Sequence, residues 1–459
     1  MCLCLQRRIH TLAARPRAAV LRSHGCRQKA CWHERLRRFV CVPTLLVRCS
    51  TLACADLPTF FLHAPTDAQH APRSPTRSHV RTASGAAWKE GNIDYTGTLM
   101  VFVLKFVSTA MDYTDGGLKT DTATLTAYQQ AARLTALPSV LEFLGYVFFP
   151  CTLLAGPWMP MADYLAYARR TGVWSPTAKK PPSAMLPALQ RCTLGLVCAG
   201  IHAVYAPQVP ETAFLDASWL QKHRSTLFRL VYMWAMGFTA RCKYYFAWTW
   251  AHASCMTSGL SWTGYDPSTG RADWSRASNI DVLGVELATS AATFPATWNT
   301  RTGLWLRHYC YERLAPPHRG RAPFWALLVT QALSGIWHGV QPGYALFFIG
   351  SSFMFHASKV MFRYQRGLTG LALTASNVVH GIIAAFHLNY LAAPFIAITL
   401  PAGWASMKAV GFAGHISMVG ICILGAVIPP PRDKKTASAT SGASPVPAAG
   451  GRKLSKKLA

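Results

Sequence analysis

Acidic residues are scarce in this chain, and so are charged residues altogether. The 459 residues include 18 Asp and Glu against 46 Lys and Arg, and only 14% of the chain is charged. A soluble globular protein carries about 25% charged residues. Hydrophobic residues make up 51% and aromatic residues 12% of the chain. This balance argues against an ordinary soluble enzyme and indicates a polytopic membrane protein.

The net charge of +28 raises the question of a nucleic-acid partner. The basic residues, however, gather in the N-terminal region, in short loops and in the tail, between apolar runs. That distribution is typical of cytoplasmic loops and of contacts with anionic lipid headgroups. Because no basic stripe with interleaved aromatic residues lies outside the apolar runs, we expect no nucleic-acid partner.

The 14 cysteines form no Cys-x-x-Cys pair. Half of them precede residue 55, and the others lie singly in apolar runs, where cysteine behaves as a small apolar residue. Cys26, Cys31, His33 and Cys41 have a loose zinc-like spacing, but no second ordered pair completes a set of four ligands. We therefore expect no metal site.

The composition divides the chain into three regions. Residues 1–90 are rich in Arg and Cys and poor in acids. We expect a poorly ordered N-terminal extension there, and a transit peptide or a wrongly joined upstream segment are the alternatives. Residues 91–430 hold the long apolar runs and are predicted to form a transmembrane catalytic domain. Residues 431–459 are rich in Pro, Ala, Ser and Lys, which predicts a disordered basic tail in the cytosol.

Apolar runs long enough to cross a bilayer, which takes about 20 helical residues, recur through residues 91–430. We expect an all-α, polytopic transmembrane helical bundle, with re-entrant or amphipathic helices around a central catalytic chamber. The run at 98–111 is a short span or an interfacial helix, because Lys105 interrupts it. The other predicted spans are 138–156, 186–205, 227–251, 323–337, 344–361, 371–388 and about 404–428.

Residues 262–321 form a polar insert that is too long for a simple turn and is not predicted to cross the membrane. We expect a functional loop or amphipathic helices on the membrane face. Basic residues flank the next two runs, so both flanks favour the cytosol and residue 338 lies near the inner turn. Lys456 and Lys457 resemble the dilysine retrieval signal of endoplasmic reticulum membrane proteins, although a basic tail alone also explains them.

One histidine lies alone in an apolar run. Between Phe324 and His356, His338 is the only histidine, acid or base. An ionisable side chain at membrane depth is unfavourable, so its default interpretation is a functional site that faces a polar cavity. Asn299 lies 39 residues earlier in a polar, aromatic block, and we expect the fold to bring it to the same cavity. A buried structural histidine and a helix-capping asparagine are the plainer alternatives.

Several ordered blocks occur between residues 137 and 344. They are 137–146 with 154–157, 243–248, 258–266, 278–281, Trp298-Asn299-x-x-Thr302-x-x-Trp305-Leu306-Arg307, 311–313, Ser334-Gly335-Ile336-Trp337-His338-Gly339 and Pro342-Gly343-Tyr344. Together they resemble the membrane-bound O-acyltransferase family, most closely its lysophospholipid acyltransferase branch. The resemblance covers about residues 92–430. The family normally has further spans before the counterpart of Tyr95, and His252 stands where that branch usually has Glu.

The resemblance implies transfer of a fatty acyl group from acyl-CoA to the free hydroxyl of a lysophospholipid. A hydroxyl needs a general base as it attacks, and the imidazole of His338 suits that role. Asn299 is a candidate oxyanion donor or substrate-positioning residue. Arg307, Arg313 and Lys243 are candidates to bind CoA phosphates, and anchoring to anionic headgroups is the alternative.

Trp298, Trp305 and Trp337 complete the candidate substrate-binding residues, either as walls of the site or as interfacial anchors. Acyl-CoA is expected as a co-substrate, with no bound cofactor, and membrane lipids are the remaining partners. The expected location is the endoplasmic reticulum membrane, with several spans. Headgroup, acyl-chain and positional preference depend on pocket shape, and the sequence leaves them and the oligomeric state open.

Three other functions share some of these features. The same fold could use another acceptor, such as a sterol, diacylglycerol or a protein. A transporter could use His338 and Glu142 as a proton relay, but it would need internal repeats or paired broken helices, and the sequence contains no repeat. An inactive relative would also fit the unusual N-terminal region.

Overall fold

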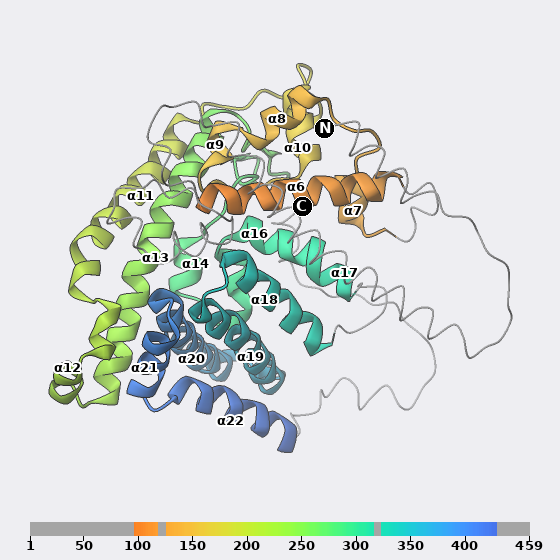
Figure 1. Cartoon of the computed structure of the whole chain (residues 1–459). Coiled ribbons are helices and arrows are strands. Elements are labelled where there is room, and N and C mark those ends of the chain that lie inside the picture. The colour runs from red at the N-terminus through yellow and green to blue at the C-terminus, as the bar shows by residue number, and fades with distance from the viewer. Residues whose placement is uncertain (1–95, 118–124, 316–322, 429–459) are drawn as a thin grey trace, which may run out of the picture. The chain divides into compact units, whose positions relative to one another are not determined.

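The computed structural model describes residues 96–117, 125–315 and 323–428, which are mostly helical (Figure 1). The extension predicted at 1–90 and the tail predicted at 431–459 lie outside the described residues. The helices that matter below are α6 (Thr96–Gly117), α7 (Ala127–Ala132), α8 (Val140–Val147), α9 (Pro150–Leu153), α10 (Met161–Ala168), α11 (Met185–Tyr205), α12 (Ala217–Lys222), α13 (Thr226–Thr257), α14 (Val282–Glu286), α15 (Phe294–Thr297), α16 (Thr300–Trp305), α17 (Glu312–Leu314), α18 (Phe324–His338), α19 (Pro342–Gln365), α20 (Gly370–Ala397), α21 (Leu400–Ala409) and α22 (Ala413–Val427).

Three helices of the described residues are long and apolar enough to cross a membrane. They are α11 with the 3-10 turns that continue it (Met185–Leu215), α19 and α20. They agree with the spans predicted at 186–205, 344–361 and 371–388. The run at 404–428 is instead a pair, α21 and α22, bent by 70° at Gly411 and Phe412, which both have positive φ. The all-α membrane-protein prediction is confirmed.

The single crossing predicted at 138–156 is wrong, because two short helices occupy this stretch. Ser139 begins α8 with a reciprocal cap, in which its hydroxyl accepts from the Glu142 N–H and the Glu142 carboxylate accepts from the Ser139 N–H. The helix ends at Phe148, and Pro150 starts α9 at a position where a missing N–H does no harm. Capping and proline chemistry therefore divide a run that hydropathy alone makes continuous.

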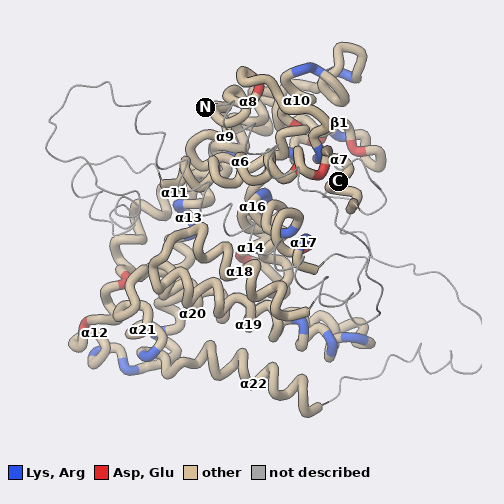
Figure 2. The backbone as a smooth tube through the Cα atoms, turned by 45° about the vertical axis from the view of Figure 1, so that its right-hand side comes forward, with Lys and Arg blue, Asp and Glu red and all other residues tan. Residues whose placement is uncertain are grey.

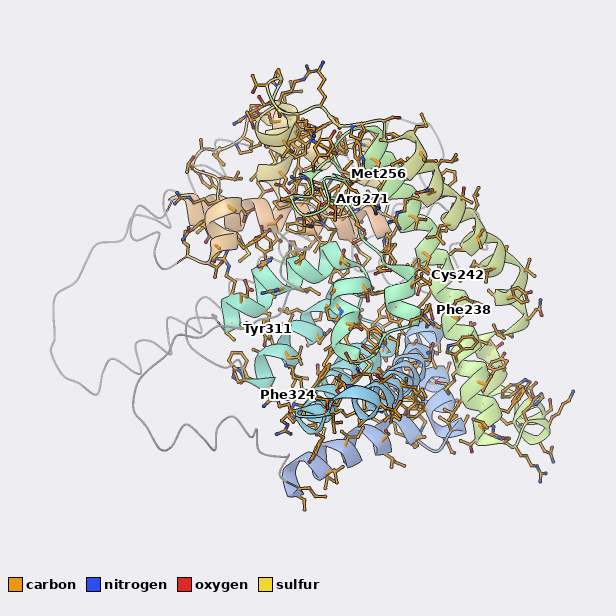
Figure 3. The ribbon with its side chains drawn as sticks, turned by 180° about the vertical axis from the view of Figure 1, so that it is seen from behind. Phe238, Cys242, Met256, Arg271, Tyr311 and Phe324 are labelled. Atoms are coloured by element: carbon orange, nitrogen blue, oxygen red, sulfur yellow. The ribbon has the colours of Figure 1, made fainter. Side chains whose placement is uncertain are left out.

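Two further predicted spans differ in length from a simple crossing. The run at 227–251 belongs to α13, which has 32 residues and packs along α11. Figure 3 marks Phe238, Cys242 and Met256 along this helix. The run at 323–337 forms α18, which has 15 residues. At 1.5 Å per residue, α18 is shorter than the hydrocarbon core of a bilayer and does not amount to a full crossing by itself.

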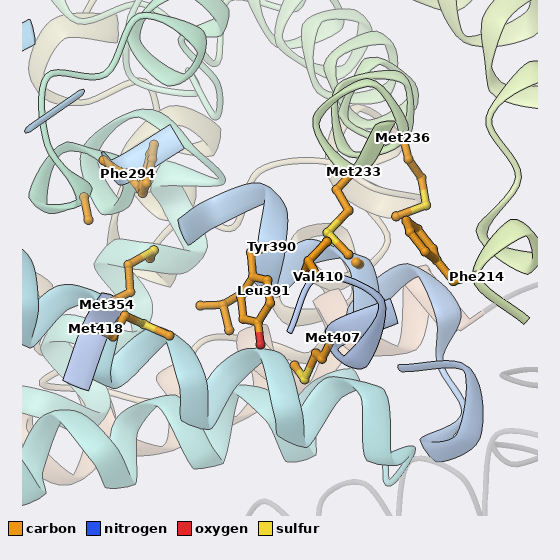
Figure 4. Close-up of a cluster of buried hydrophobic side chains, with 13 residues drawn as sticks. Phe214, Met233, Met236, Phe294, Met354, Tyr390, Leu391, Met407, Val410 and Met418 are labelled. Atoms are coloured by element: carbon orange, nitrogen blue, oxygen red, sulfur yellow. The ribbon is translucent and has the colours of Figure 1, made fainter. Parts of the chain in front are cut away.

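Methionine and aromatic side chains fill the largest buried cluster, between α13, α19, α20, α21 and α22 (Figure 4). Flexible thioethers pack well in irregular gaps between helices. Figure 2 shows that charged residues are sparse on α20 and α22, whose sequences contain no Asp, Glu, Lys or Arg. Helices α20 and α22 therefore form an uncharged, apolar C-terminal region of the protein.

The polar insert predicted at 262–321 is confirmed as a non-spanning segment over its described part, which ends at residue 315. It holds a two-stranded antiparallel hairpin, β1 (Gly264–Tyr265) and β2 (Ala272–Asp273), followed by α14 to α17. Between α16 and α17 lies a π-helical turn, Leu306–Tyr311. Such turns are rare and frequent at functional sites.

Helix α6 is tied to the protein by the lysine that interrupts its apolar run. Lys105 is 1% exposed, and its ammonium donates to the carbonyls of Tyr146 (2.8 Å) and Val147 (3.0 Å) and to the hydroxyl of Thr152 (2.9 Å). Two of these acceptors are carbonyls at the C-terminus of α8, where a cation is favoured. A buried charge is tolerated here because all three of its donors are used.

Candidate functional site

His338 is the last residue of α18, and the residue after it explains why the helix stops there. Gly339 has φ +133° and ψ 172°, a backbone conformation open in practice to glycine alone. Its N–H donates back to the carbonyls of Gly335 and Ile336, which closes the helix end. The Trp-His-Gly block is thus a helix terminus that presents the imidazole.

Aromatic rings surround the imidazole of His338. Phe348 of α19 stacks on it with ring centroids 4.8 Å apart, while Phe395 of α20 and Tyr344 of α19 lie at 5.5 and 5.8 Å. Within the described residues neither ring nitrogen makes a hydrogen bond, yet neither nitrogen is sealed from solvent. A neutral imidazole carries one N–H donor and one acceptor nitrogen. His338 therefore offers both to a molecule that enters beside it.

Three of the other histidines on the apolar helices are used differently, whereas His356 packs against the Phe324 ring and makes no hydrogen bond within the described residues. His380 contacts the Ser358 hydroxyl (2.8 Å) and the Gln365 amide oxygen (3.2 Å). His387 contacts the Ser417 hydroxyl, and His415 contacts Tyr390. These three rings hold helices together, as expected of structural histidines. The plainer alternative for His338, a hydrogen-bonded structural histidine, does not describe its geometry.

Asn299 has a left-handed backbone, with φ +43° and ψ +50°, immediately before α16. It occupies the N-cap position, but its side chain makes no capping hydrogen bond. The cap comes from Asn279 instead, whose carbonyl accepts from the Thr300 N–H and whose side-chain oxygen accepts from the Arg301 N–H, both at 2.9 Å. The Asn299 amide is left without a hydrogen bond in the described part of the chain and is not sealed from solvent. A capping role therefore belongs to Asn279.

Three tryptophans tie the segments of the site to one stripe of α6. The acceptors lie four residues apart, so they follow one another along a single face of the helix. The hydrogen bonds are Trp337 Nε1 to the Met100 carbonyl (3.0 Å), Trp305 Nε1 to the Leu104 carbonyl (3.0 Å) and Trp158 Nε1 to the Ser108 hydroxyl (3.1 Å). Helix α6 thereby fixes α16, which starts after Asn299, and α18, which ends at His338.

A second connection runs through ring contacts. The Trp298 ring lies 5.7 Å from Tyr244 and 4.9 Å from Trp248, both on α13. On the other side of the site, Tyr344 of α19 contacts His338 as described above. Ring contacts therefore place the residue that precedes Asn299 against α13 and the imidazole of His338 against α19 and α20.

A buried ion pair supports this aromatic wall from behind. The Arg241 guanidinium forms two hydrogen bonds with the Glu286 carboxylate, at 2.7 and 2.8 Å, and a third with the Asn389 side-chain oxygen at 2.7 Å. The Tyr245 hydroxyl also donates to Glu286, and the Tyr245 ring packs against Trp298. The network joins α13, α14 and α20 with every charged group paired, which makes it structural.

The predicted substrate-binding residues have different surroundings. Lys243 is exposed, with its ammonium 5.3 Å from the centre of the Tyr244 ring. The Arg307 side chain is 60% exposed and forms an ion pair with Glu312 at 2.8 Å. Arg313 forms a two-pronged ion pair with Asp115, so its charge is already compensated.

The predicted tryptophans also differ from one another. Trp305 is 2% exposed and donates its only N–H to α6, so it packs the protein. Trp337 lies 4.8 Å from His338, and Trp298 lies beside Asn299.

Sequence reasoning missed Asn279, Trp158, Glu286 and Arg301. Asn279 could have been suspected, because it lies in one of the ordered blocks, next to Asp281, which caps α14. Arg301 lies in the same block as Asn299, where it was read only as a spacer. Trp158 and Glu286 had no local signal, because their roles depend on contacts with residues far along the chain.

Comparison with known proteins agrees with this architecture. Residues 80–391, more than half of the chain, match the model of the MBOAT, membrane-bound O-acyltransferase family. A protein named lysophospholipid acyltransferase 1 from Arabidopsis thaliana is 38% identical over 356 residues, which cover 76% of each chain.

More distant relatives include a lysophospholipid acyltransferase from Saccharomyces cerevisiae, 30% identical over 71% of this chain and 56% of the relative. Membrane-bound glycerophospholipid O-acyltransferase 2 from Homo sapiens is 29% identical over 72% of this chain and 64% of the relative. The family match at residues 80–391 covers the helices and the insert that carry His338 and Asn299. The chain belongs to the membrane-bound O-acyltransferase family.

Proposed function

We propose that this protein transfers a fatty acyl group from acyl-CoA to the free hydroxyl of a lysophospholipid, with His338 as general base and Asn299 as oxyanion donor. The observation that carries the proposal is that the polar atoms of these two side chains are free to bind a substrate. Both lie among packed helices, and the polar atoms of both are unbonded within the described residues but not sealed from solvent. Relatives named as lysophospholipid acyltransferases support the choice of acceptor.

The reaction needs a base because an alcohol has a pKa far above 7. As the hydroxyl oxygen attacks the thioester carbonyl, the free ring nitrogen of His338 takes its proton. The tetrahedral intermediate then collapses, the carbon–sulfur bond breaks, and the imidazolium returns the proton to the departing thiolate. The products are a diacyl phospholipid and free CoA thiol, and His338 ends neutral.

Asn299 supplies the second requirement. The carbonyl oxygen becomes negative in the intermediate, and an amide N–H can donate to it without a charge of its own. Loss of one such donor typically slows turnover by roughly 100- to 1,000-fold. The Asn299 side chain is available for this role, because Asn279 supplies the cap of the helix that follows. The chain tolerates an unfavourable backbone conformation at this position, which is common at functional sites.

Exposed cations near the site suit the acyl donor. We infer that Lys243 and Arg307 bind phosphates of CoA, since both have accessible side chains. An arginine fork and a lysine point charge are the usual phosphate partners. We further propose the endoplasmic reticulum membrane as the location, with the tail in the cytosol, because acyl-CoA is a water-soluble donor and the flanks of the predicted spans are basic.

Two substitutions test the catalytic pair without changing the fold. His338→Gln keeps a polar side chain of similar volume among the aromatic rings but has no basic nitrogen. Asn299→Gly removes the amide and fits the left-handed backbone at least as well as Asn. Microsomes that contain the unmodified chain should incorporate labelled acyl-CoA into a lysophospholipid. Both variants should accumulate normally and lose at least 100-fold in rate.

The same assay separates the alternatives. Normal turnover by His338→Gln would refute the base assignment, and normal turnover by Asn299→Gly would show that only the backbone conformation matters. A panel of acceptors with one acyl-CoA should favour lysophospholipids over a sterol, diacylglycerol or a peptide. Activity with one of those acceptors alone would be consistent with acyl transfer but would reject a lysophospholipid as the acceptor.

A further inference from the structure

Arg301, two residues after Asn299, has a guanidinium group that is mostly unused. Its Nε–H donates to the Trp158 carbonyl at 3.1 Å, which fixes the side chain along the face of α16 that also carries Trp305. The two Nη nitrogens carry four further N–H donors. Within the described residues neither makes a hydrogen bond, and neither is sealed from solvent. The planar end of the guanidinium is therefore open to a ligand.

The surroundings of Arg301 leave it without a dedicated counterion. Asp163 contributes the nearest negative charge, but it forms an ion pair with Arg276 at 3.3 Å. Arg276 is itself anchored, with Nε donating to the Trp262 carbonyl at 3.0 Å and its guanidinium 4.7 Å from the Trp174 ring. Burial lowers the pKa of Arg301, against the opposing influence of Asp163. Two guanidinium groups thus share the charge of one carboxylate.

Two other arginines of the same protein show what a structural role looks like. Arg241 uses three hydrogen bonds to Glu286 and Asn389, and Arg313 forms a two-pronged pair with Asp115. Arg241 has partners on two other helices, and Arg313 has a carboxylate partner on α6, although the Arg313 Nε makes no hydrogen bond within the described residues. Arg301 is half-buried and lacks such partners within the described residues. Because a partly desolvated charge without a counterion is unfavourable, its retention beside Asn299 indicates an anionic ligand that completes it.

We propose that the free edge of Arg301 binds a phosphate group of a substrate, which adds a specificity-determining residue to the acyl-transfer site. The inference rests on the proposed function. Two substrates carry phosphate: the lysophospholipid, in its headgroup, and acyl-CoA. In a lysophospholipid the phosphate is only a few bonds from the reacting hydroxyl, whereas in acyl-CoA the whole pantetheine arm separates phosphate from thioester. The closeness of Arg301 to Asn299 in the chain favours the lysophospholipid phosphate.

The test uses full-length protein in membranes, with KM and kcat measured for each substrate in turn. Arg301→Gln should raise KM for lysophospholipid by roughly 10- to 100-fold, the usual range for a charge-assisted hydrogen-bonded pair. Arg301→Lys should raise it less, because the charge remains while the planar fork is lost. KM for acyl-CoA should stay unchanged. Arg169→Gln is the matched control, since Arg169 is exposed and pairs with Glu142, and both KM values should match the unmodified protein.

Each outcome decides the inference. A rise confined to acyl-CoA would place a CoA phosphate on Arg301 and retain the phosphate site. Unchanged KM values for both substrates, or a fall in kcat alone, would overturn it. If Arg301→Gln does not accumulate, Arg301→Lys decides, and unchanged KM values in that variant overturn the inference.

A neutral acceptor provides a second readout. Arg301→Gln should narrow the preference of the enzyme for a lysophospholipid over a monoacylglycerol, which lacks phosphate. An unaltered preference, together with an unaltered KM for acyl-CoA, contradicts the inference. If the unmodified protein acylates no lysophospholipid, the proposed function fails. In that case the binding of a labelled lysophospholipid to purified protein, compared between the unmodified chain and Arg301→Gln, still tests the phosphate site.

Discussion

Gly343 lies at the start of α19, where the chain passes closest to the end of α20, and it offers a sharp test of the packing around His338. Its N–H donates to the Ile398 carbonyl at 2.8 Å. A Cβ atom added here would lie 2.2 Å from the Pro394 carbonyl oxygen and 2.7 Å from that of Ile398. Both are backbone atoms, so neither can rotate away. Gly343→Ala must therefore push α19 and α20 apart.

The expected size follows from that contact. Overfilling a packed site typically costs about 1–3 kcal/mol, and two backbone clashes put Gly343→Ala near 3 kcal/mol. The displaced α19 also carries Tyr344 and Phe348, which contact His338, so acyl transfer should fall as well. Gly420→Ala is the control, because a Cβ there meets nothing within 4 Å and alanine favours a helix interior by about 1 kcal/mol.

The measurement is the unfolding temperature of each purified variant in the same detergent, followed by acyl-transfer rates. The two variants add the same methyl group, yet Gly343→Ala should unfold at a lower temperature than the unmodified chain and Gly420→Ala at an equal or higher one. Equal unfolding temperatures for Gly343→Ala and the unmodified protein would refute the close approach of α19 and α20.

Three further predictions concern charge and hydrogen bonding. The hydrogen bond from Arg169 holds the pKa of the Glu142 carboxyl at about 2, below its usual 4.5. The unmodified protein should therefore be more stable than Glu142→Gln by the full amount above pH 4.5, and this difference should vanish as the pH falls to about 2. Unfolding temperatures of both proteins at pH 7 and pH 3 check this. Glu286→Gln leaves the Arg241 charge uncompensated and should destabilise the protein by about 3 kcal/mol, part of which the double variant with Arg241→Met recovers in the same assay. Trp337→Phe removes one donor to α6 and should cost about 1 kcal/mol of stability with a lower kcat, measured by unfolding and initial rates.

Hydropathy was sufficient to locate the long spans. The runs at 186–205, 344–361 and 371–388 each became one helix, since an uninterrupted apolar run of this length has no better conformation in a membrane. Hydropathy did not predict where capping, proline or positive φ interrupts a helix. The run at 138–156 is divided by a cap at Ser139 and by Pro150. The run at 404–428 bends where Gly411 and Phe412 adopt positive φ, and neither effect changes hydropathy.

The candidate site was predictable in its residues but not in its connections. His338 could be found because an isolated histidine in an apolar run is unusual. The anchoring of α16 and α18 to α6 could not, because a Trp N–H carries no sequence sign of its partner, and Trp337 finds Met100 at a separation of 237 residues. Arg301 escaped notice for a related reason. Arg301 matters because most of its N–H donors make no hydrogen bond within the described residues, and only a structure shows which donors remain unused.

The two asparagines beside α16, Asn279 and Asn299, test whether the structural role and the catalytic role belong to different residues. Asn279 is 2% exposed and caps the helix, so Asn279→Ala should destabilise the protein by about 1–2 kcal/mol, as loss of a cap does. The Asn299 side chain makes no hydrogen bond within the described residues, so Asn299→Gly should unfold at the same temperature as the unmodified chain. Its acyl-transfer rate should nevertheless fall far more than that of Asn279→Ala assayed well below its unfolding temperature. The opposite ranking, with Asn299→Gly active and unstable, would make Asn299 the structural residue and leave the oxyanion without its donor.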